Sequence, residues 1–158
     1  MKQNMIMSEE SIQDRIYTIR NLQVMMDADL ASIYEVETKQ LNKAVNRNID
    51  RFPERCRLII TQKEYDDLRF QNGTSSFEHG GRRYLPYVFT EQGVSMLSAV
   101  LRSQIAIEVS IKIIDSFVYM RRFISQNALL FQKIDIIEKK QQKTDEQLEK
   151  VLNAIEDQ

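Results

Sequence analysis

The sequence predicts a mostly helical α+β fold, in which a helix-turn-helix-like domain with a small β-hairpin and flap is followed by a C-terminal coiled-coil helix. Three observations carry this prediction. All four glycines and both prolines lie between Pro53 and Gly93, so residues 1–52 and 94–158 contain no strong helix breaker. Short β-prone runs occur near the N-terminus. From Leu130 onward, a heptad seam recurs every three or four positions and is apolar except at Gln141 and Thr144.

The composition restricts the class of protein. The 158 residues are 42% hydrophobic, which suits about one domain with a real core, and the net charge is -1. No apolar run approaches the roughly 20 residues that a membrane span needs, and the N-terminus lacks a signal-peptide core. We therefore expect a cytoplasmic protein without membrane contact. Cys56 and His79 are each the sole residue of their type, so we expect no disulfide framework, no bound metal and no cofactor.

The first elements are short. Two β-prone runs, residues 16–19 and 24–26, predict a small hairpin. Asp27 is a favourable N-cap for a helix that reaches Tyr34.

Residues 27–46 fit the helix-turn-helix template. Thr38 is predicted to cap the second helix, which should end before Pro53. Glu35 occupies the turn position where glycine is usual, so a left-handed backbone there would be strained. Small and apolar residues stand where two short helices must pack, namely Leu30, Ala31, Tyr34, Val36, Leu41 and Ala44. An ordinary helical hairpin inside a core is the alternative interpretation.

The middle of the chain alternates strands and a helix. Residues 57–60 predict a strand, and Thr61 with Glu64 forms a capping box for a helix to about Phe70. Residues 71–81 are loop-like, and residues 82–89 form a strand candidate.

This loop and strand predict a β-flap. Pro86 argues for an edge position of the strand, because proline cannot donate to a sheet ladder. Arg82 and Arg83 would place two cations on the flap, either against a flanking phosphate or in an exposed turn.

The C-terminal part is predicted to be helical. Thr90 caps one helix, and the unbroken length of residues 105–123 favours helix over strand. We expect the tail to continue from it as a continuous or gently bent helix, with domain bounds of 12–123 and 124–158. The heptad seam comprises Leu130, Ile134, Ile137, Gln141, Thr144, Leu148, Val151 and Ile155, and its six apolar members, Leu130, Ile134, Ile137, Leu148, Val151 and Ile155, predict a homodimer.

Charge changes sign abruptly within the helix-turn-helix template. Residues 27–37 carry four acids and no base, whereas residues 38–57 carry six bases and two acids. Lysine and arginine hold phosphates or guanine, and asparagine can read an adenine edge. The alternative is a solvated helix face. The asymmetry predicts binding to double-stranded DNA through Thr38, Lys39, Asn42, Lys43, Asn46, Arg47, Asn48 and Arg51, together with Arg82 and Arg83 of the flap.

Three blocks of the sequence are characteristic. They are DADLASIYEVETKQLNKAVNRN from Asp27, RFP from Arg51 and YLPYVFTEQGVSMLSAVL from Tyr84. Together they closely resemble the phage ORF-six N-terminal domain family, a relative of the KilA-N and Bro-N group, over about residues 12–123. The resemblance implies a DNA-binding module of phages and prophage-derived bacterial genes, often N-terminal to a variable second domain. Here the coiled-coil tail occupies the place of that second domain.

The resemblance can be carried over by position. It matches Thr38, Lys39, Asn42, Lys43, Asn46, Arg47 and Asn48 to the family's second-helix block, and residues 81–83 to its flap. Glu35 departs from the usual turn glycine, and Asn21 stands where Arg-Gly is common. Both departures concern the geometry of turns.

Three functions remain open. The first is a dimeric, sequence-specific DNA-binding regulator of transcription, whose half-sites would lie about one helical turn apart. The second is a prophage antirepressor or other interaction module that binds a phage or host regulatory protein through its apolar helices or tail. The third is a nuclease using Glu64, Asp66 and Asp67. Adjacent carboxylates on a helix do not face each other and no phosphate-binding loop is present, so we expect no catalysis.

Overall fold

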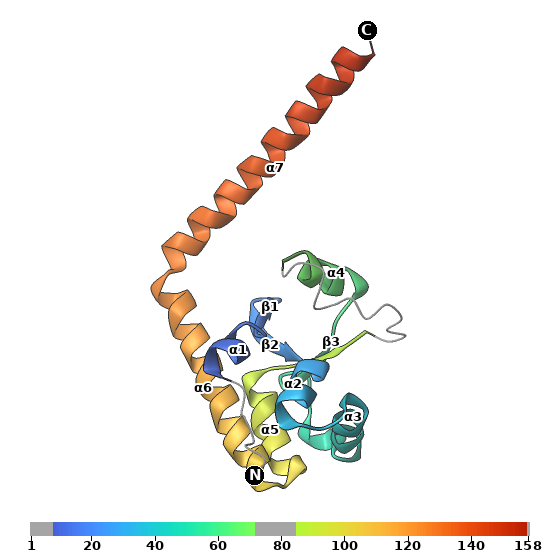
Figure 1. The fold of residues 1–158 in the computed structure, drawn as a ribbon, viewed down its shortest axis with the longest axis vertical. Coiled ribbons are helices and arrows are strands. Elements are labelled where there is room, and N and C mark those ends of the chain that lie inside the picture. Colours follow the sequence, from blue (N-terminus) through green and yellow to red (C-terminus); the bar gives the residue numbers. More distant parts are fainter. Residues whose placement is uncertain (1–7, 72–84, 158) are drawn as a thin grey trace. The chain divides into compact units, whose positions relative to one another are not determined.

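The computed structural model describes residues 8–71 and 85–157 (Figure 1). Helices outnumber strands, as the sequence predicts. The helices are α1 (Glu9–Gln13), α2 (Asp27–Tyr34), α3 (Thr38–Arg47), the 3-10 helix η1 (Ile49–Arg51), α4 (Gln62–Gln71), α5 (Glu91–Leu101), α6 (Gln104–Gln126) and α7 (Ala128–Glu156). The strands are β1 (Tyr17–Ile19), β2 (Leu22–Met26), β3 (Arg57–Ile59) and β4 (Tyr87–Phe89).

The four strands form one antiparallel sheet in the order β1-β2-β4-β3. The predicted hairpin is confirmed. Its two-residue turn, Arg20 and Asn21, has φ values of 52° and 63°, the positive values that a tight hairpin turn requires. The predicted edge position of the Pro86 strand is wrong, because β4 pairs with β2 on one side and β3 on the other. Pro86 precedes the first paired residue, Tyr87, so its missing N–H removes no ladder hydrogen bond.

The sheet separates two apolar clusters. Side chains alternate across a strand, so neighbouring residues of β2 enter different clusters. Met25 joins its partner Phe89 and the helices α2, α3, α5 and α6, whereas Met26 joins its partner Val88, together with Leu68 of α4. The larger cluster includes Tyr34, Phe52, Cys56 and Phe117.

Helix α5 begins with a side-chain cap, as predicted. The Thr90 hydroxyl accepts a hydrogen bond from the Gly93 N–H at 3.2 Å, and the Thr90 N–H donates to the Cys56 carbonyl at 3.0 Å. A Cβ at Gly93 would overlap that same carbonyl oxygen. Glycine at this position therefore lets the first turn of α5 lie directly against the chain entering β3.

Two other predicted caps are wrong by one residue. Helix α2 begins at Asp27 itself and has Met26 as its N-cap, and α3 begins at Thr38 after Glu37. Neither cap residue makes a side-chain cap hydrogen bond. Asp27 is 3% exposed and its carboxylate joins three elements instead, as described below.

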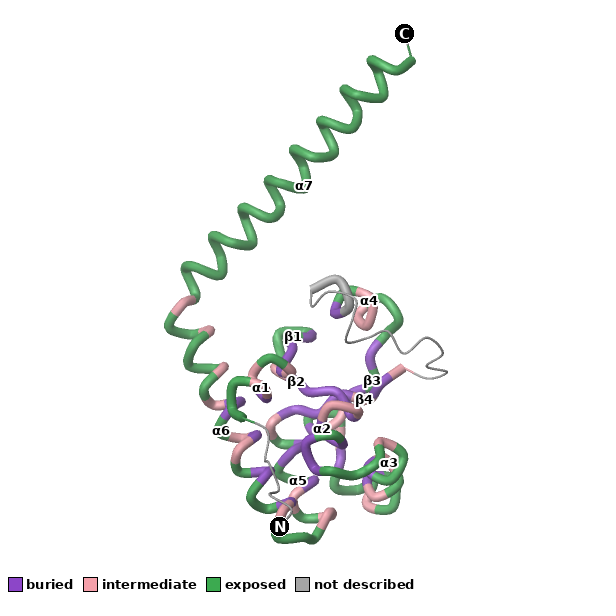
Figure 2. The backbone as a smooth tube through the Cα atoms, in the orientation of Figure 1, coloured by how far each residue is buried: buried purple, intermediate pink, exposed green. Residues whose placement is uncertain are grey.

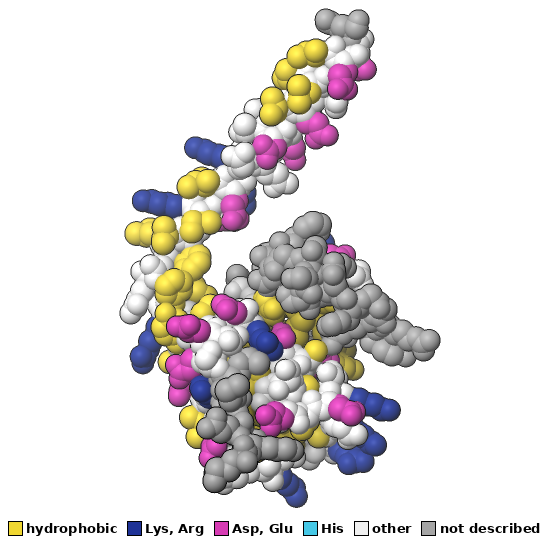
Figure 3. All heavy atoms as spheres, in the orientation of Figure 1, with side chains coloured by type: hydrophobic (Ala, Val, Ile, Leu, Met, Phe, Trp, Pro, Cys, Tyr) yellow, Lys and Arg dark blue, Asp and Glu magenta, His cyan; other side chains and the backbone are white. Residues whose placement is uncertain are grey.

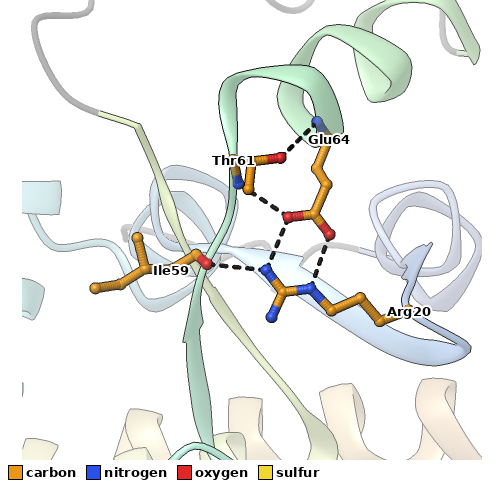
Figure 4. A network of polar contacts seen from close by, with 4 residues as sticks. All are labelled: Arg20, Ile59, Thr61 and Glu64. Carbon is orange, nitrogen blue, oxygen red and sulfur yellow. Dashed lines mark hydrogen bonds and ion pairs between the residues drawn. The ribbon is translucent and has the colours of Figure 1, made fainter.

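The capping box of α4 is confirmed and is reinforced from a distant turn (Figure 4). Glu64 accepts the Thr61 N–H at 2.9 Å, and the Thr61 hydroxyl accepts the Glu64 N–H at 3.1 Å. Arg20, in the β1–β2 turn, donates to both Glu64 carboxylate oxygens, at 2.8 and 2.9 Å, and to the Ile59 carbonyl at 3.3 Å. These bonds, that of Arg20 foremost, lower the pKa of Glu64 from 4.5 to about 2.

The chain divides into two compact units between Met120 and Arg121. The predicted helix over residues 105–123 is confirmed as part of α6. The helix expected to be continuous or gently bent into the tail is interrupted at one residue, Asn127, where φ is −111° and ψ is 23°. The Asn127 side-chain amide and backbone N–H both donate to the Phe123 carbonyl, at 2.8 and 3.1 Å, so a side chain competes there for a helical acceptor.

Helix α7 is exposed along its whole described length (Figure 2). The six apolar residues predicted to pair two copies all lie on it and are all exposed, namely Leu130, Ile134, Ile137, Leu148, Val151 and Ile155. Among the described helices, none has a stretch long and apolar enough to cross a membrane.

Candidate nucleic-acid interface

Helices α2 and α3 are joined by the three residues Glu35, Val36 and Glu37. Glu35 has a left-handed backbone, with φ 59° and ψ 40°, as the template predicts for that position. The Val36 N–H donates to the Ala31 carbonyl at 2.9 Å and the Glu35 N–H to the Ser32 carbonyl at 3.2 Å. This pattern is a Schellman motif, which ends α2 sharply and directs the chain into α3.

The inner face of α3 fixes the helix to the core. Leu41 and Val45 are fully buried, one turn apart, in the cluster that also holds Val94 and Leu97 of α5. Ala31 of α2 is 2% exposed, which agrees with the small residue expected where two helices cross. Leu41 and Val45 mark the buried side of α3, so the residues on the opposite side of the helix form its outer face.

The outer face of α3 carries a shallow open groove of about 620 Å³. Its lining residues are five of the predicted DNA-binding residues, namely Lys39, Asn42, Lys43, Asn46 and Arg47. Lys39, Lys43, Asn46 and Arg47 are exposed, whereas Asn42 is half-buried. Lysine and arginine side chains gather over α3 in the space-filling view (Figure 3). The fold thus brings three cations and two amides to one surface.

Asp27 holds the side chain of Asn42, one of the residues that line the groove. One carboxylate oxygen accepts the Ala28 N–H at 2.7 Å, and the other accepts the Asn42 side-chain amide at 3.0 Å and the Tyr87 N–H at 3.4 Å. A carboxylate cannot donate, so this contact fixes which end of the Asn42 amide faces Asp27. The carbonyl oxygen of Asn42 is buried and has no hydrogen-bond partner within the described parts of the chain.

Arg57 adds a cation that was not among the residues predicted for the site. Its guanidinium donates to the Asn46 side-chain oxygen at 3.3 Å and lies 4.1 Å from the centroid of the Tyr87 ring. Arg57 belongs to β3 and Tyr87 to the neighbouring strand β4, and the hydrogen bond to Asn46 connects Arg57 to α3. In the sequence, the one feature that could have indicated a role for Arg57 was its place in the basic segment 38–57.

Three further predicted residues, Thr38, Asn48 and Arg51, are not among the residues that line the groove. Thr38 is half-buried at the start of α3, and Arg51 is exposed in η1. Asn48 follows the last residue of α3, and its side-chain amide donates to the Ala44 carbonyl at 2.9 Å, so it caps the helix end. Arg82 and Arg83 lie outside the described residues.

Two of the three carboxylates considered for catalysis, those of Glu64 and Asp66, accept hydrogen bonds from nearby side chains or backbone. Glu64 is held by Arg20 and Thr61, and Asp66 accepts the Gln62 side-chain amide at 3.0 Å. Within residues 8–71 and 85–157, no group of three or more histidine, cysteine or acidic residues is arranged to hold a metal ion. Burial raises the pKa of the Cys56 thiol, which makes this residue a weaker nucleophile.

The sequence matches a known domain family. The family model described as the ORF6N domain matches residues 14–100, more than half of the chain. The matched stretch contains the whole sheet and α2, α3 and α4, whereas α6 and α7 lie beyond it. No curated protein and no solved structure matches the chain.

Proposed function

The chain belongs to the ORF6N domain family, a phage-type family, and on that premise we propose that it is a sequence-specific regulator of transcription that binds double-stranded DNA through the outer face of α3. The observation that carries the proposal is the groove on α3, where Lys39, Lys43 and Arg47 line the same surface as two asparagine side chains. Cations of this kind hold phosphates, and an exposed asparagine amide such as that of Asn46 can read a base edge in the major groove.

The packing of α3 supports this role. A reading helix must be held rigidly while one face stays free for the nucleic acid. Leu41 and Val45 anchor the inner face, and Asp27 ties Asn42 to α2 and β4. Lys39, Lys43 and Arg47 are exposed, and their concentration on a chain of net charge -1 favours a binding role over a structural one.

We further propose a cytoplasmic protein that forms a homodimer through α7 and acts without catalysis, cofactor or membrane contact. The exposed apolar residues of α7 support the pairing, because a helix whose apolar stripe faces water gains stability when another helix covers it. The commitment of Glu64 to Arg20 argues against a metal-dependent nuclease at α4.

Alanine substitution of the groove cations tests the DNA proposal. We expect Lys43→Ala and Arg47→Ala each to weaken binding to any duplex, and each to make the plot of log affinity against log salt shallower by about 0.9. The measurement is fluorescence anisotropy of a labelled duplex over a salt series. Lys150→Ala on α7 is the control, since it removes the same charge from an exposed site on the other compact unit. Unchanged affinity and slope in both groove variants would contradict the proposal.

One observation favours the antirepressor alternative. Ile107 and Ile111 are exposed one turn apart on α6, at 46% and 56%, and could contact a phage or host regulatory protein. Under this alternative the groove variants keep full activity, whereas Ile111→Glu removes binding of the partner. The two proposals therefore predict opposite results from the same set of variants.

A further inference from the structure

The tail helix presents a definite pairing surface. Its seam consists of Ile134, Gln141, Leu148 and Ile155 at a positions, and of Leu130, Ile137, Thr144 and Val151 at d positions. All eight lie within α7, and its apolar members range from 41% exposed at Ile134 to 64% at Ile155. We propose that α7 pairs with α7 of a second copy as a parallel, in-register coiled coil. This inference rests on the proposed homodimer and adds its orientation and register.

The apolar residues alone allow either orientation. In a parallel pair each seam residue faces its own counterpart. In an antiparallel pair centred between residues 142 and 143, Leu130 would face Ile155 and Ile134 would face Val151, so the apolar layers are equally complete. The choice between the orientations must come from the residues that border the seam.

The charges that border the seam are divided between its two edges. Lys133 and Lys140 occupy the g edge, and Glu138 and Asp145 occupy the e edge. In a parallel, in-register pair, a g residue lies beside the e residue five positions later in the second copy. Lys133 then meets Glu138 and Lys140 meets Asp145, and the symmetry repeats both pairs on the other side of the seam.

An antiparallel pair loses these contacts. It sets the lysine edge beside a lysine edge and the acidic edge beside an acidic edge, which places Glu138 near Asp145 of the second copy. Gln141 also donates to Asp145 within one helix, at 3.0 Å, which keeps that carboxylate at the seam border. The ion pair between Asp135 and Lys139, at 3.0 Å, occupies b and f positions away from the seam. The charge pattern therefore favours the parallel orientation.

The polar residues in the middle of the seam set the register. In register, Gln141 faces Gln141 and Thr144 faces Thr144, so each polar side chain can hydrogen-bond its counterpart. A shift of one heptad would place Gln141 against Ile134 or Leu148 and leave its amide without a partner. Staggered pairing is thus disfavoured, although the polar layers weaken the dimer.

Cysteine cross-linking of the full chain tests orientation and register together. In a parallel, in-register pair, Val151→Cys and Ile134→Cys should each form a covalent dimer on mild oxidation, because facing seam positions come within disulfide distance. Glu146→Cys, at an outward f position, and the unsubstituted chain with its buried Cys56 are the controls and should stay uncross-linked. An antiparallel pair would instead cross-link only a mixture of the two seam variants, and that result would overturn the proposal.

Measurement of the molecular mass distinguishes a failure of the homodimer from a failure of the parallel, in-register orientation. The unsubstituted chain should have the mass of a dimer in sedimentation equilibrium, and Leu148→Glu with Ile155→Glu should give monomers. Lys133→Glu with Lys140→Glu should weaken self-association about tenfold or more, and mixing it with Glu138→Lys plus Asp145→Lys should restore pairing. A monomeric or trimeric unsubstituted chain would refute the homodimer itself. Neither result depends on DNA binding, so the groove proposal stands or fails separately.

Discussion

At the scale of single residues, Glu35 shows the cost of a left-handed backbone. Its φ of 59° is a conformation that glycine adopts freely and that costs other residues roughly 1 kcal/mol. We expect Glu35→Gly to raise the free energy of unfolding by about 1 kcal/mol, because the exposed side chain that is removed contributes little packing. Urea denaturation followed by circular dichroism measures the change.

The matched control lies in α2, the helix that ends just before Glu35. Ser32 is exposed inside α2 with ordinary helical geometry, so Ser32→Gly should lower stability by about 0.5 kcal/mol. Opposite signs at two glycine substitutions three residues apart would tie the effect to the backbone conformation. A destabilised Glu35→Gly variant would show that the turn owes its stability to something other than φ.

Single residues were predictable from sequence where the signal was local. The left-handed Glu35 and the caps at Thr61 and Thr90 follow from neighbours within four positions, and the structure confirms them. The role of Asp27 was not predictable, because its partners Asn42 and Tyr87 lie 15 and 60 residues away in the sequence. An aspartate before a helix suggests an N-cap until the sheet and α3 are placed around it.

At the scale of elements, the contact between Arg20 and Glu64 joins the β1–β2 turn to the start of α4. The folded pKa of Glu64, about 2, lies below its ordinary value of 4.5, so the charged form stabilises the fold. This contribution is complete above about pH 4.5 and is lost as the pH falls towards 2. Its size is modest because Arg20 is exposed to solvent.

Glu64→Gln removes the titrating group while keeping a similar shape. We expect the wild-type chain to be more stable than this variant at pH 7, and the difference to shrink between about pH 4.5 and pH 2. Urea midpoints of both proteins across this range measure the difference. Asp67→Asn on the same helix is the control, and its difference should not follow the same course. A Glu64→Gln difference that is constant with pH would refute the account.

Elements were predictable from sequence where periodicity or caps were strong. The hairpin, α5 and the helical state of residues 105–123 all follow from such local patterns. The central position of β4 does not follow from a local pattern. Pro86 removes one N–H donor, but it does not determine which strands pair with β4 on either side. The break at Asn127 was also not predicted from the sequence, because asparagine disfavours a helix less strongly than glycine or proline.

At the scale of the whole molecule, the site combines a local and a non-local part. The helical spacing of Lys39, Lys43 and Arg47 predicts that they share one face of α3, and the groove contains all three. Arg57 joins them through strand pairing, which the sequence does not reveal. Arg82 and Arg83 remain predictions, because they lie outside the described residues.

The central claim is that the outer face of α3 contacts the phosphates of DNA, and one measurement tests it directly. It is fluorescence-anisotropy binding of the unsubstituted chain to a random-sequence duplex over a series of salt concentrations. Three phosphate contacts from Lys39, Lys43 and Arg47 predict that log affinity falls linearly with log salt, with a slope of about −3 for each bound domain. Absence of binding even at low salt would contradict the claim and favour the protein-interaction alternative.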